Sequence, residues 1–289
     1  MKIALGTAQF GLDYGVANTN GLVDPKEVRS ILIQAARYGI DILDTAPAYG
    51  KSERTLGVAG IDEFSVVSKL PSLPPKLDNI THWVHNTVSD SLHCLGVNSL
   101  YGLLLHNPMD LFGPHGKALV SALQGLKKDC SVQKIGVSIY NPSILSDVTR
   151  LMDVDLVQAP MNILDRNLTT SGWLDKLKES NVEVHCRSLF LQGLLLMPRA
   201  QIPQRFEKWA SIWDYWEGIT EGSATLKLQL CINSISSLPQ VDKVVLGVQS
   251  LKQLDELMDV AKTPKDDYDL SSLKTNDCDL IDPSRWDKL

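Results

Sequence analysis

The sequence has no long basic run: its 289 residues include 28 lysines and arginines against 34 aspartates and glutamates, a formal net charge of −6. This balance disfavours nucleic acid or an anionic membrane as the main partner. The sequence also contains no apolar stretch near the roughly 20 residues that a membrane-spanning helix needs. Its N-terminus enters a strand-like run without a long apolar leader. We therefore expect a cytoplasmic protein.

Cysteines are few, and none belongs to a Cys-x-x-Cys pair. An odd number without paired spacing argues against a disulfide framework or a zinc site and favours a reducing compartment. No Gly-x-Gly-x-x-Gly motif follows an early strand, which counts against a doubly wound nucleotide-binding sheet. The five cysteines are Cys94, Cys130, Cys186, Cys231 and Cys278.

Short apolar runs alternate with segments of helical period along the chain, in eight strand–helix units without a clear linker. An eight-fold barrel typically uses about 250 residues. The pattern therefore predicts an α/β protein, a single-domain (β/α)8 TIM barrel over residues 1–289. The expected strands are 2–7, 40–43, 64–68, 100–105, 134–137, 154–157, 182–186 and 244–246. The expected helices are 25–38, 56–59, 78–95, 115–128, one beginning at 142, 172–180, 223–238 and 251–261.

Two segments do not fit the repeat. Residues 188–221 form a long, irregular connection that is rich in aromatic side chains, and connections of that length are uncommon without a function. The polar tail 263–289 is expected to form a strap over the surface. The aromatic residues of this segment are Trp209, Trp213, Tyr215 and Trp216. Of these, Trp213, Tyr215 and Trp216, together with Tyr14, either line a substrate pocket or form a satellite hydrophobic cluster.

Three successive expected strands end on ionisable residues, Asp44, Lys69 and His106, and Tyr49 lies in the short loop after Asp44. In a parallel barrel the carboxyl ends of all strands open onto one face, where active sites lie. Neighbouring strands are about 4.8 Å apart, so the three side chains can converge. A structural ion pair closing the barrel is the simpler interpretation for any one residue, but not for all of them together.

Such a group suits proton transfer coupled to reduction of a carbonyl. A free phenol has a pKa of about 10, and a nearby ammonium lowers it. A carboxylate beside that ammonium keeps it charged despite burial. An imidazole can hydrogen-bond the substrate carbonyl and orient it.

Short motifs around these residues follow one another in a specific order. They are Leu5-Gly6-Thr7-Ala8-Gln9-Phe10-Gly11, Leu43-Asp44-Thr45-Ala46, Tyr49-Gly50, Ser52-Glu53, Leu56-Gly57, Ser68-Lys69 and Leu104-Leu105-His106. Together they resemble the aldo-keto reductase family over most of the chain. The resemblance implies a (β/α)8 barrel with NADPH, or alternatively NADH, as hydride donor. It also implies a catalytic tetrad of Asp44, Tyr49, Lys69 and His106, with Tyr49 as general acid.

The resemblance implies cofactor contacts at the ends of the remaining strands. Ser138 and Gln158 would hold the nicotinamide carboxamide, the segment after 186 would flank the nicotinamide and pyrophosphate, and the helix after 247 would grip the adenosine phosphate. The residues implied are Gly6, Thr7, Ser138, Gln158, Arg187, Ser188, Leu189, Gln192, Gly193, Gly247, Gln249, Ser250, Gln253 and Glu256.

Several positions depart from the family pattern. Ile139 stands where many relatives have Asn, and Arg187 where many stack a Tyr on the nicotinamide ring. Gln253 and Leu257 replace an Arg and an Asn that NADPH-preferring members carry at these positions. Lys252 could bind the 2′-phosphate instead, or be an ordinary surface lysine. The resemblance therefore supports a nicotinamide cofactor more strongly than it supports NADPH.

The expected function is reduction of an aldehyde, ketone or keto-sugar by a monomer or weak homo-oligomer. Three alternatives stay open: a sugar or alcohol dehydrogenase that runs oxidatively, a cofactor-binding regulatory barrel without turnover, and an aldolase that uses Lys69 as a Schiff base. The histidines His82, His85 and His93 are expected on the surface, and no metal site is expected.

Overall fold

Eight parallel strands form a closed barrel in the computed structural model, which describes residues 3–236, 238–263 and 268–289. Each strand pairs with its neighbour in the sequence, and β1 also pairs with β8. The predicted fold class is confirmed. The strands are β1 Ile3–Gly6, β2 Ile42–Asp44, β3 Ser65–Leu70, β4 Leu100–Leu105, β5 Val132–Ser138, β6 Leu156–Pro160, β7 Glu183–Arg187 and β8 Lys243–Gly247.

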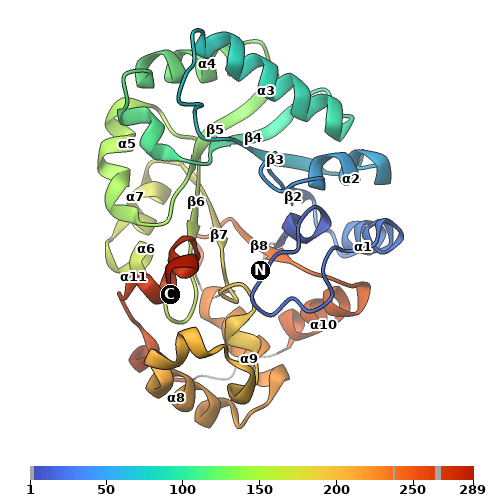
Figure 1. Ribbon diagram of the computed structural model, residues 1–289, viewed down its shortest axis with the longest axis vertical. Coiled ribbons are helices and arrows are strands. Elements are labelled where there is room, and N and C mark those ends of the chain that lie inside the picture. Colours follow the sequence, from blue (N-terminus) through green and yellow to red (C-terminus); the bar gives the residue numbers. More distant parts are fainter. Residues whose placement is uncertain (1–2, 237, 264–267) are drawn as a thin grey trace.

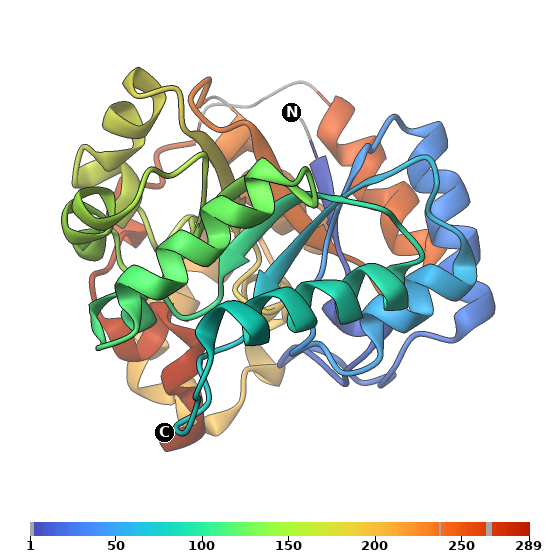
Figure 2. The same ribbon diagram turned by 90° about the horizontal axis from the view of Figure 1, so that it is seen from above.

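Helices surround the barrel (Figures 1 and 2). They are α1 Pro25–Arg37, α2 Ser52–Ala59, α3 Ile80–Leu95, α4 Gly116–Lys128, α5 Leu145–Leu151, α6 Asn167–Thr170, α7 Trp173–Glu179, α8 Ala210–Thr220, α9 Ala224–Ser236, α10 Leu251–Lys262 and α11 Cys278–Ile281. Residue 2 of the first expected strand and residue 237 of the seventh expected helix lie outside the described residues. Within the described ranges, no helix combines the length and apolar character that crossing a membrane would require.

The helices begin where local hydrogen bonding predicts. Asp24 precedes α1, and its carboxylate accepts a hydrogen bond from the Lys26 N–H at 2.8 Å, while Pro25 takes the first helical position. This satisfies one of the amide groups that a helix start leaves unpaired. One face of α1 is apolar and buried against the barrel, as the helical spacing of its residues predicts. The buried residues are Val28, Ile31, Leu32 and Ala35.

One difference from the predicted strands affects the site. β3 continues to Leu70, which pairs with Leu105, so Lys69 lies inside the strand and not just beyond it. Side chains alternate across a strand, and Val67 belongs to an interior cluster with Ala4, Ile42, Leu104 and Leu156. Lys69, two residues further on, therefore points into the barrel above that apolar layer.

The segment 188–221 is not irregular, because it contains three short 3-10 helices followed by the eleven-residue helix α8. Trp213 and Trp216 are buried, and their indole N–H groups donate to the carbonyls of Phe206 and Leu195, each at 2.9 Å. The satellite-cluster interpretation therefore holds for these two residues and the pocket-wall interpretation is wrong for them. Tyr215 is exposed.

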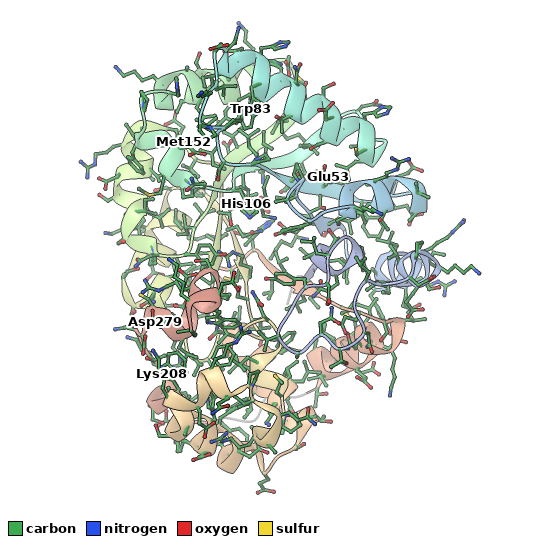
Figure 3. The ribbon with its side chains drawn as sticks, in the orientation of Figure 1. Glu53, Trp83, His106, Met152, Lys208 and Asp279 are labelled. Carbon is green, nitrogen blue, oxygen red and sulfur yellow. The ribbon has the colours of Figure 1, made fainter. Side chains whose placement is uncertain are left out.

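The C-terminal tail covers this cluster. The Trp286 ring packs edge-on against Phe206 at 4.8 Å between centroids, and the Trp209 indole N–H donates to Asp277 at 2.9 Å. An ion pair of 3.3 Å between Lys208 and Asp279 joins the same two segments, and Figure 3 shows both residues side by side. The tail is thus a packed strap over the 188–221 segment; its residues 264–267 lie outside the described residues.

A partly buried polar network lies at the amino ends of the strands, opposite the predicted active face. The Glu183 carboxylate accepts hydrogen bonds from Tyr101 Oη at 2.7 Å and from Lys134 Nζ, and it lies 2.7 Å from His185 Nε2. Burial alone would raise the pKa of Glu183, but its hydrogen bonds to His185, Lys134 and Tyr101 outweigh this and lower it to about 2. Such contacts at this end of a barrel stabilise the fold.

We expect Glu183→Gln to reduce the free energy of unfolding by about 1–3 kcal/mol at neutral pH, because Lys134 loses its anionic partner. The stabilisation by Glu183 is complete above its ordinary pKa of 4.5 and disappears as the pH falls toward 2. Chemical unfolding of both proteins between pH 3 and pH 7 measures this. A difference between the two proteins that stays constant over this range contradicts the expectation.

Candidate active site

Asp44 and Lys69 form a buried ion pair inside the barrel mouth. Lys69 is 1% exposed, and its Nζ donates to Asp44 Oδ1 at 2.7 Å and to the Thr45 carbonyl at 2.9 Å. The other carboxylate oxygen of Asp44 accepts a hydrogen bond of 2.6 Å from the Gln158 side-chain amide. Two opposite charges can stay ionised in such a place only when both are paired and hydrogen-bonded, and here both are.

The ammonium state of Lys69 is strongly favoured. Burial alone would lower the pKa of Lys69, but the Asp44 carboxylate and the Tyr49 phenol more than offset it, so the pKa is raised above its ordinary value. The Lys69 nitrogen lies 4.9 Å from the centre of the Tyr49 ring. The site therefore holds a positive charge beside a phenol.

The Tyr49 loop is held by close backbone packing. A Cβ atom on Gly11 would lie 1.9 Å from the Tyr49 carbonyl oxygen, and one on Gly50 would lie 2.5 Å from the Gly11 carbonyl oxygen. Gly50 also has a φ of +61°, in the left-handed region that favours glycine. The two loops can approach this closely only because both positions lack a side chain, so Tyr49 has a defined place over the barrel.

The start of α2 anchors the same loop. Ser52 Oγ donates to the Thr7 carbonyl at 2.8 Å, and Ser68 Oγ donates to the buried Glu53 carboxylate at 2.7 Å. Figure 3 shows Glu53 at the side of the barrel near α2, away from His106. The Ser52-Glu53 motif therefore ties α2 to the ends of β1 and β3 instead of entering the mouth.

His106 follows β4 directly, and its backbone N–H donates to the Leu70 carbonyl at 3.0 Å. Its ring meets the Tyr49 ring edge-on, with 6.1 Å between centroids and an angle of 87°. Burial, followed by the charges of Lys69 and Arg187, lowers the pKa of His106 to about 4. The imidazole is therefore neutral at physiological pH and can donate a hydrogen bond to a carbonyl oxygen. The four residues predicted to be catalytic thus lie together.

Ser138 and Gln158 also reach this group. Ser138 Oγ donates to the Gln158 side-chain oxygen at 3.3 Å, while the amide of Gln158 donates to Asp44. Thr7 Oγ1 donates to the Asp44 backbone carbonyl at 2.9 Å, and Gly6 pairs with Asp44 in the sheet. These predicted cofactor residues therefore also support Asp44, a link that sequence reasoning missed.

The segment after β7 has the backbone of an anion cradle. Ser188, Leu191, Gln192 and Gly193 all have positive φ values, between +48° and +90°. Strained backbone of this kind clusters at ligand sites, and successive amide groups in it form concave sites for anions. The Leu189 side chain is buried in the core, so only its backbone can face a ligand. The N–H groups of Leu191 and Gly193 donate to the Ser188 and Phe190 carbonyls at 2.9 Å, so the pyrophosphate contact that the family resemblance implies for this segment would rest on its remaining amide groups.

The cradle is positioned from both sides. The buried Asn162, which sequence reasoning missed, donates from its side-chain amide to the Ser188 carbonyl at 3.1 Å. On the other side, a Cβ atom on Gly193 would lie 2.6 Å from the Ala17 side chain. Loop 15–18 and the cradle therefore meet across the barrel mouth.

Arg187 lies at the edge of the mouth. Its guanidinium donates to the Ile139 carbonyl at 2.9 Å and to Ser188 Oγ at 3.1 Å, and it stacks over the Tyr140 ring at 4.2 Å. Tyr14 lies nearby: partial burial and the neighbouring Tyr49 raise its pKa to about 12. Of the expected aromatic wall, Tyr14 is the member that borders Tyr49.

The residues predicted to grip the adenosine phosphate lie together at the start of α10. Ser250 caps the helix, with its hydroxyl accepting from the Gln253 N–H at 3.2 Å. Gly247 ends β8, and a Cβ atom there would lie 2.5 Å from the Gln9 side chain. Lys252 is exposed and lies 3.6 Å from Glu256. The predicted catalytic and cofactor-binding residues thus lie at the carboxyl ends of the strands, in the segments that follow them, or in α10.

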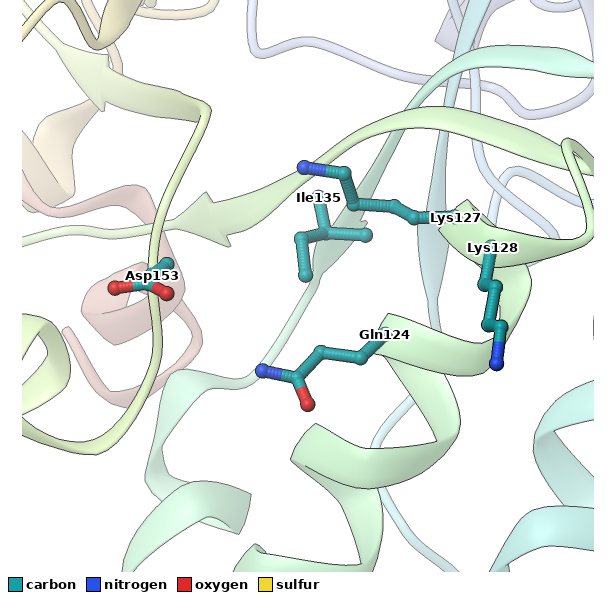
Figure 4. A pocket seen from close by; sticks show the side chains of 5 residues that line it. All are labelled: Gln124, Lys127, Lys128, Ile135 and Asp153. Atoms are coloured by element: carbon teal, nitrogen blue, oxygen red, sulfur yellow. The ribbon is translucent and has the colours of Figure 1, made fainter.

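A separate hollow of about 320 Å³ lies between the end of α4, β5 and the loop before β6, lined by Gln124, Lys127, Lys128, Ile135 and Asp153 (Figure 4). These residues belong to the amino end of the barrel, where contacts stabilise the fold. The hollow is therefore distinct from the group around Tyr49.

Comparison with known proteins identifies the family. The family model described as Aldo/keto reductase family matches residues 2–277. A curated relative, the NADH-specific methylglyoxal reductase of Escherichia coli (strain K12), is 25% identical over 216 residues; the match covers 67% of this chain and spans 65% of the relative's length.

Solved structures share the fold at lower identity. The holo form of an aldo-keto reductase from Bacillus halodurans has a TM-score of 0.74 at 19% identity, covering 98% of this chain and 95% of that one. A glycerol dehydrogenase from Gluconobacter oxydans has a TM-score of 0.69 at 21% identity, covering 94% and 90%.

Proposed function

The chain belongs to the aldo/keto reductase family, and from this premise we propose that it reduces the carbonyl group of a small molecule with a bound nicotinamide cofactor, using Tyr49 as the proton donor. The observation that carries the proposal is the ion pair of 2.7 Å between Lys69 and Asp44 beneath Tyr49 and His106. A buried charge pair of this kind next to a phenol and a neutral imidazole is a site for proton transfer.

In this proposal the residues divide the work around the carbonyl oxygen. His106, neutral because its pKa is about 4, donates a hydrogen bond to that oxygen and orients it. A bound reduced nicotinamide supplies the hydride that the carbonyl carbon accepts. Tyr49 gives its phenolic proton to the oxygen as negative charge develops there, which completes the alcohol.

Lys69 and Asp44 make that proton transfer possible. The Lys69 ammonium stabilises the negative charge left on the Tyr49 oxygen, because its nitrogen lies only 4.9 Å from the centre of the Tyr49 ring. Asp44 balances the ammonium, and Gln158 and Thr45 complete its hydrogen bonds. The pair is therefore preorganised before any substrate arrives.

The substrate class we propose is a small aldehyde or ketone, with 2-oxoaldehydes such as methylglyoxal to be tested first. The curated relative carries that activity in its name. The guanidinium of Arg187 at the edge of the mouth supports a substrate with a second oxygen beside the reacting carbonyl, since it can donate a hydrogen bond to it. Keto-sugars are the next class to test.

The alternative of an aldolase has less support. A Schiff-base lysine attacks as a free amine, whereas the pKa of Lys69 is raised and Asp44 holds it as an ammonium. An oxidative dehydrogenase would use the same residues with Tyr49 as base. The direction is a matter for measurement.

The experiment is to follow the absorbance of NADH and NADPH with a panel of aldehydes, ketones and keto-sugars, and of NAD and NADP with alcohols and sugars. We expect oxidation of the reduced cofactor that depends on the carbonyl compound. If the folded protein binds a reduced cofactor but no carbonyl compound oxidises it, the reductase proposal fails and a regulatory barrel is favoured.

A further inference from the structure

The family resemblance implies that the start of α10 would hold the adenosine phosphate if the cofactor were NADPH. The first amide groups of a helix lack partners within the helix, and together with its dipole they attract anions. A 2′-phosphate at this helix therefore needs free N–H groups and, ideally, a cation.

Three of the N–H groups here, those of Gln249, Leu251 and Gln253, already have partners. The Gln249 N–H donates to the Gln253 side-chain oxygen at 2.7 Å, and the Gln253 N–H donates to Ser250 Oγ. The Leu251 N–H donates at 2.7 Å to Oε1 of Glu27, a residue 224 positions earlier in the chain. A carboxylate from α1 thus occupies the place at which an external anion would bind.

The packing of α1 explains how Glu27 reaches this place. Figures 1 and 2 show α1 and α10 side by side, and Glu27 lies in the first turn of α1, half-buried between the two helices. Within the described residues, no ion pair neutralises Glu27. Lys252, the nearest candidate cation of α10, points to solvent with an 86% exposed side chain beside Glu256.

We propose that Glu27 is the residue that selects NADH over NADPH in this protein, an inference that rests on the proposed function of a nicotinamide-dependent reductase. A 2′-phosphate next to this carboxylate meets a like charge, and the N–H groups of Gln249, Leu251 and Gln253 are already occupied. The 2′-hydroxyl of NADH instead donates a hydrogen bond to a carboxylate, as acidic residues in other dinucleotide sites accept one. Of the two hydride donors that the family resemblance leaves open, NADPH and NADH, this proposal selects NADH.

Binding of the cofactors without any substrate tests this proposal in the full-length protein. Calorimetric titration should give an NADH affinity at least about 10-fold higher than that for NADPH. Glu27→Gln keeps an oxygen that can accept the Leu251 N–H but removes the charge. We expect about 10-fold tighter NADPH binding in this variant and less than about 3-fold change for NADH.

Two controls isolate the effect. ADP-ribose and its 2′-phosphate, titrated in the same way, report on this end of the cofactor alone and should show the same change in ratio. Glu179→Gln at the exposed end of α7 removes one negative charge elsewhere and should leave the ratio unchanged. Thermal unfolding verifies that each variant is folded.

The outcomes separate this proposal from the proposed function. If wild type binds NADPH as tightly as NADH, or if Glu27→Gln leaves the ratio unchanged, the assignment to Glu27 is overturned while the reductase proposal stands. If neither cofactor binds the folded protein, both are overturned. If NADH is preferred and the preference falls with Glu27→Gln, the assignment holds even when no carbonyl substrate has been found.

Discussion

Tyr49→Phe is expected to lower kcat by about 1000-fold, within the range for loss of a general acid. The substitution removes one oxygen and leaves the ring, so the edge-on packing against His106 at 6.1 Å and the close contact of the loops at Gly11 and Gly50 are retained. The KM for the carbonyl substrate should change much less, because His106 still orients the carbonyl. Steady-state kinetics with the best substrate measures both.

Two comparisons make this result specific. Tyr215→Phe makes the same chemical change on an exposed tyrosine of α8 and should leave kcat unaltered. Binding of NADH to Tyr49→Phe should match wild type within about 2-fold. A variant that binds cofactor, is folded and turns over at the wild-type rate would mean that another group delivers the proton, and the role of Tyr49 would be lost.

Much of the site could be predicted from the sequence because it depends on a regular feature of the fold. The ends of parallel strands meet on one face, so Asp44, Lys69 and His106 were expected together without knowledge of their exact strand boundaries. β3 extends further than its apolar run suggests, yet Lys69 still points inward because the two-residue alternation is the same.

Contacts between distant segments could not be predicted in this way. Gln158 bonds to Asp44 across 114 positions and Glu27 caps α10 across 224. Neither Gln158, an amide at the end of a strand, nor Glu27, a glutamate in the first turn of a helix, is unusual at its position. The sequence around each residue therefore gives no sign of its distant partner. The prediction of an irregular segment at 188–221 was wrong because its aromatic residues are not separated by a regular polar face, so the helical period did not indicate α8. Burial of Trp213 and Trp216 involves hydrogen bonds to the carbonyls of Phe206 and Leu195, which the period does not indicate either.

Lys69→Met should affect both activity and stability, and the two effects can be separated. Without the ammonium, the negative charge on the Tyr49 oxygen loses its stabilising partner, and we expect kcat to fall by about 100- to 1000-fold. The Asp44 carboxylate is 3% exposed and would lose its ion partner. Breaking a buried pair from one side typically costs about 3–5 kcal/mol of folding free energy. Steady-state kinetics and chemical unfolding of the variant measure the two effects.

The double variant Asp44→Asn/Lys69→Met distinguishes a catalytic pair from a structural one. Because Asn carries no charge and can still bond to Gln158, most of the lost unfolding free energy should return. The rate should not return, because the ammonium beside Tyr49 is still missing. Chemical unfolding and kcat are measured on wild type, Lys69→Met and the double variant. If kcat recovers together with stability in the double variant, the ion pair only holds the barrel mouth together, and the proton reaches the substrate without help from Lys69.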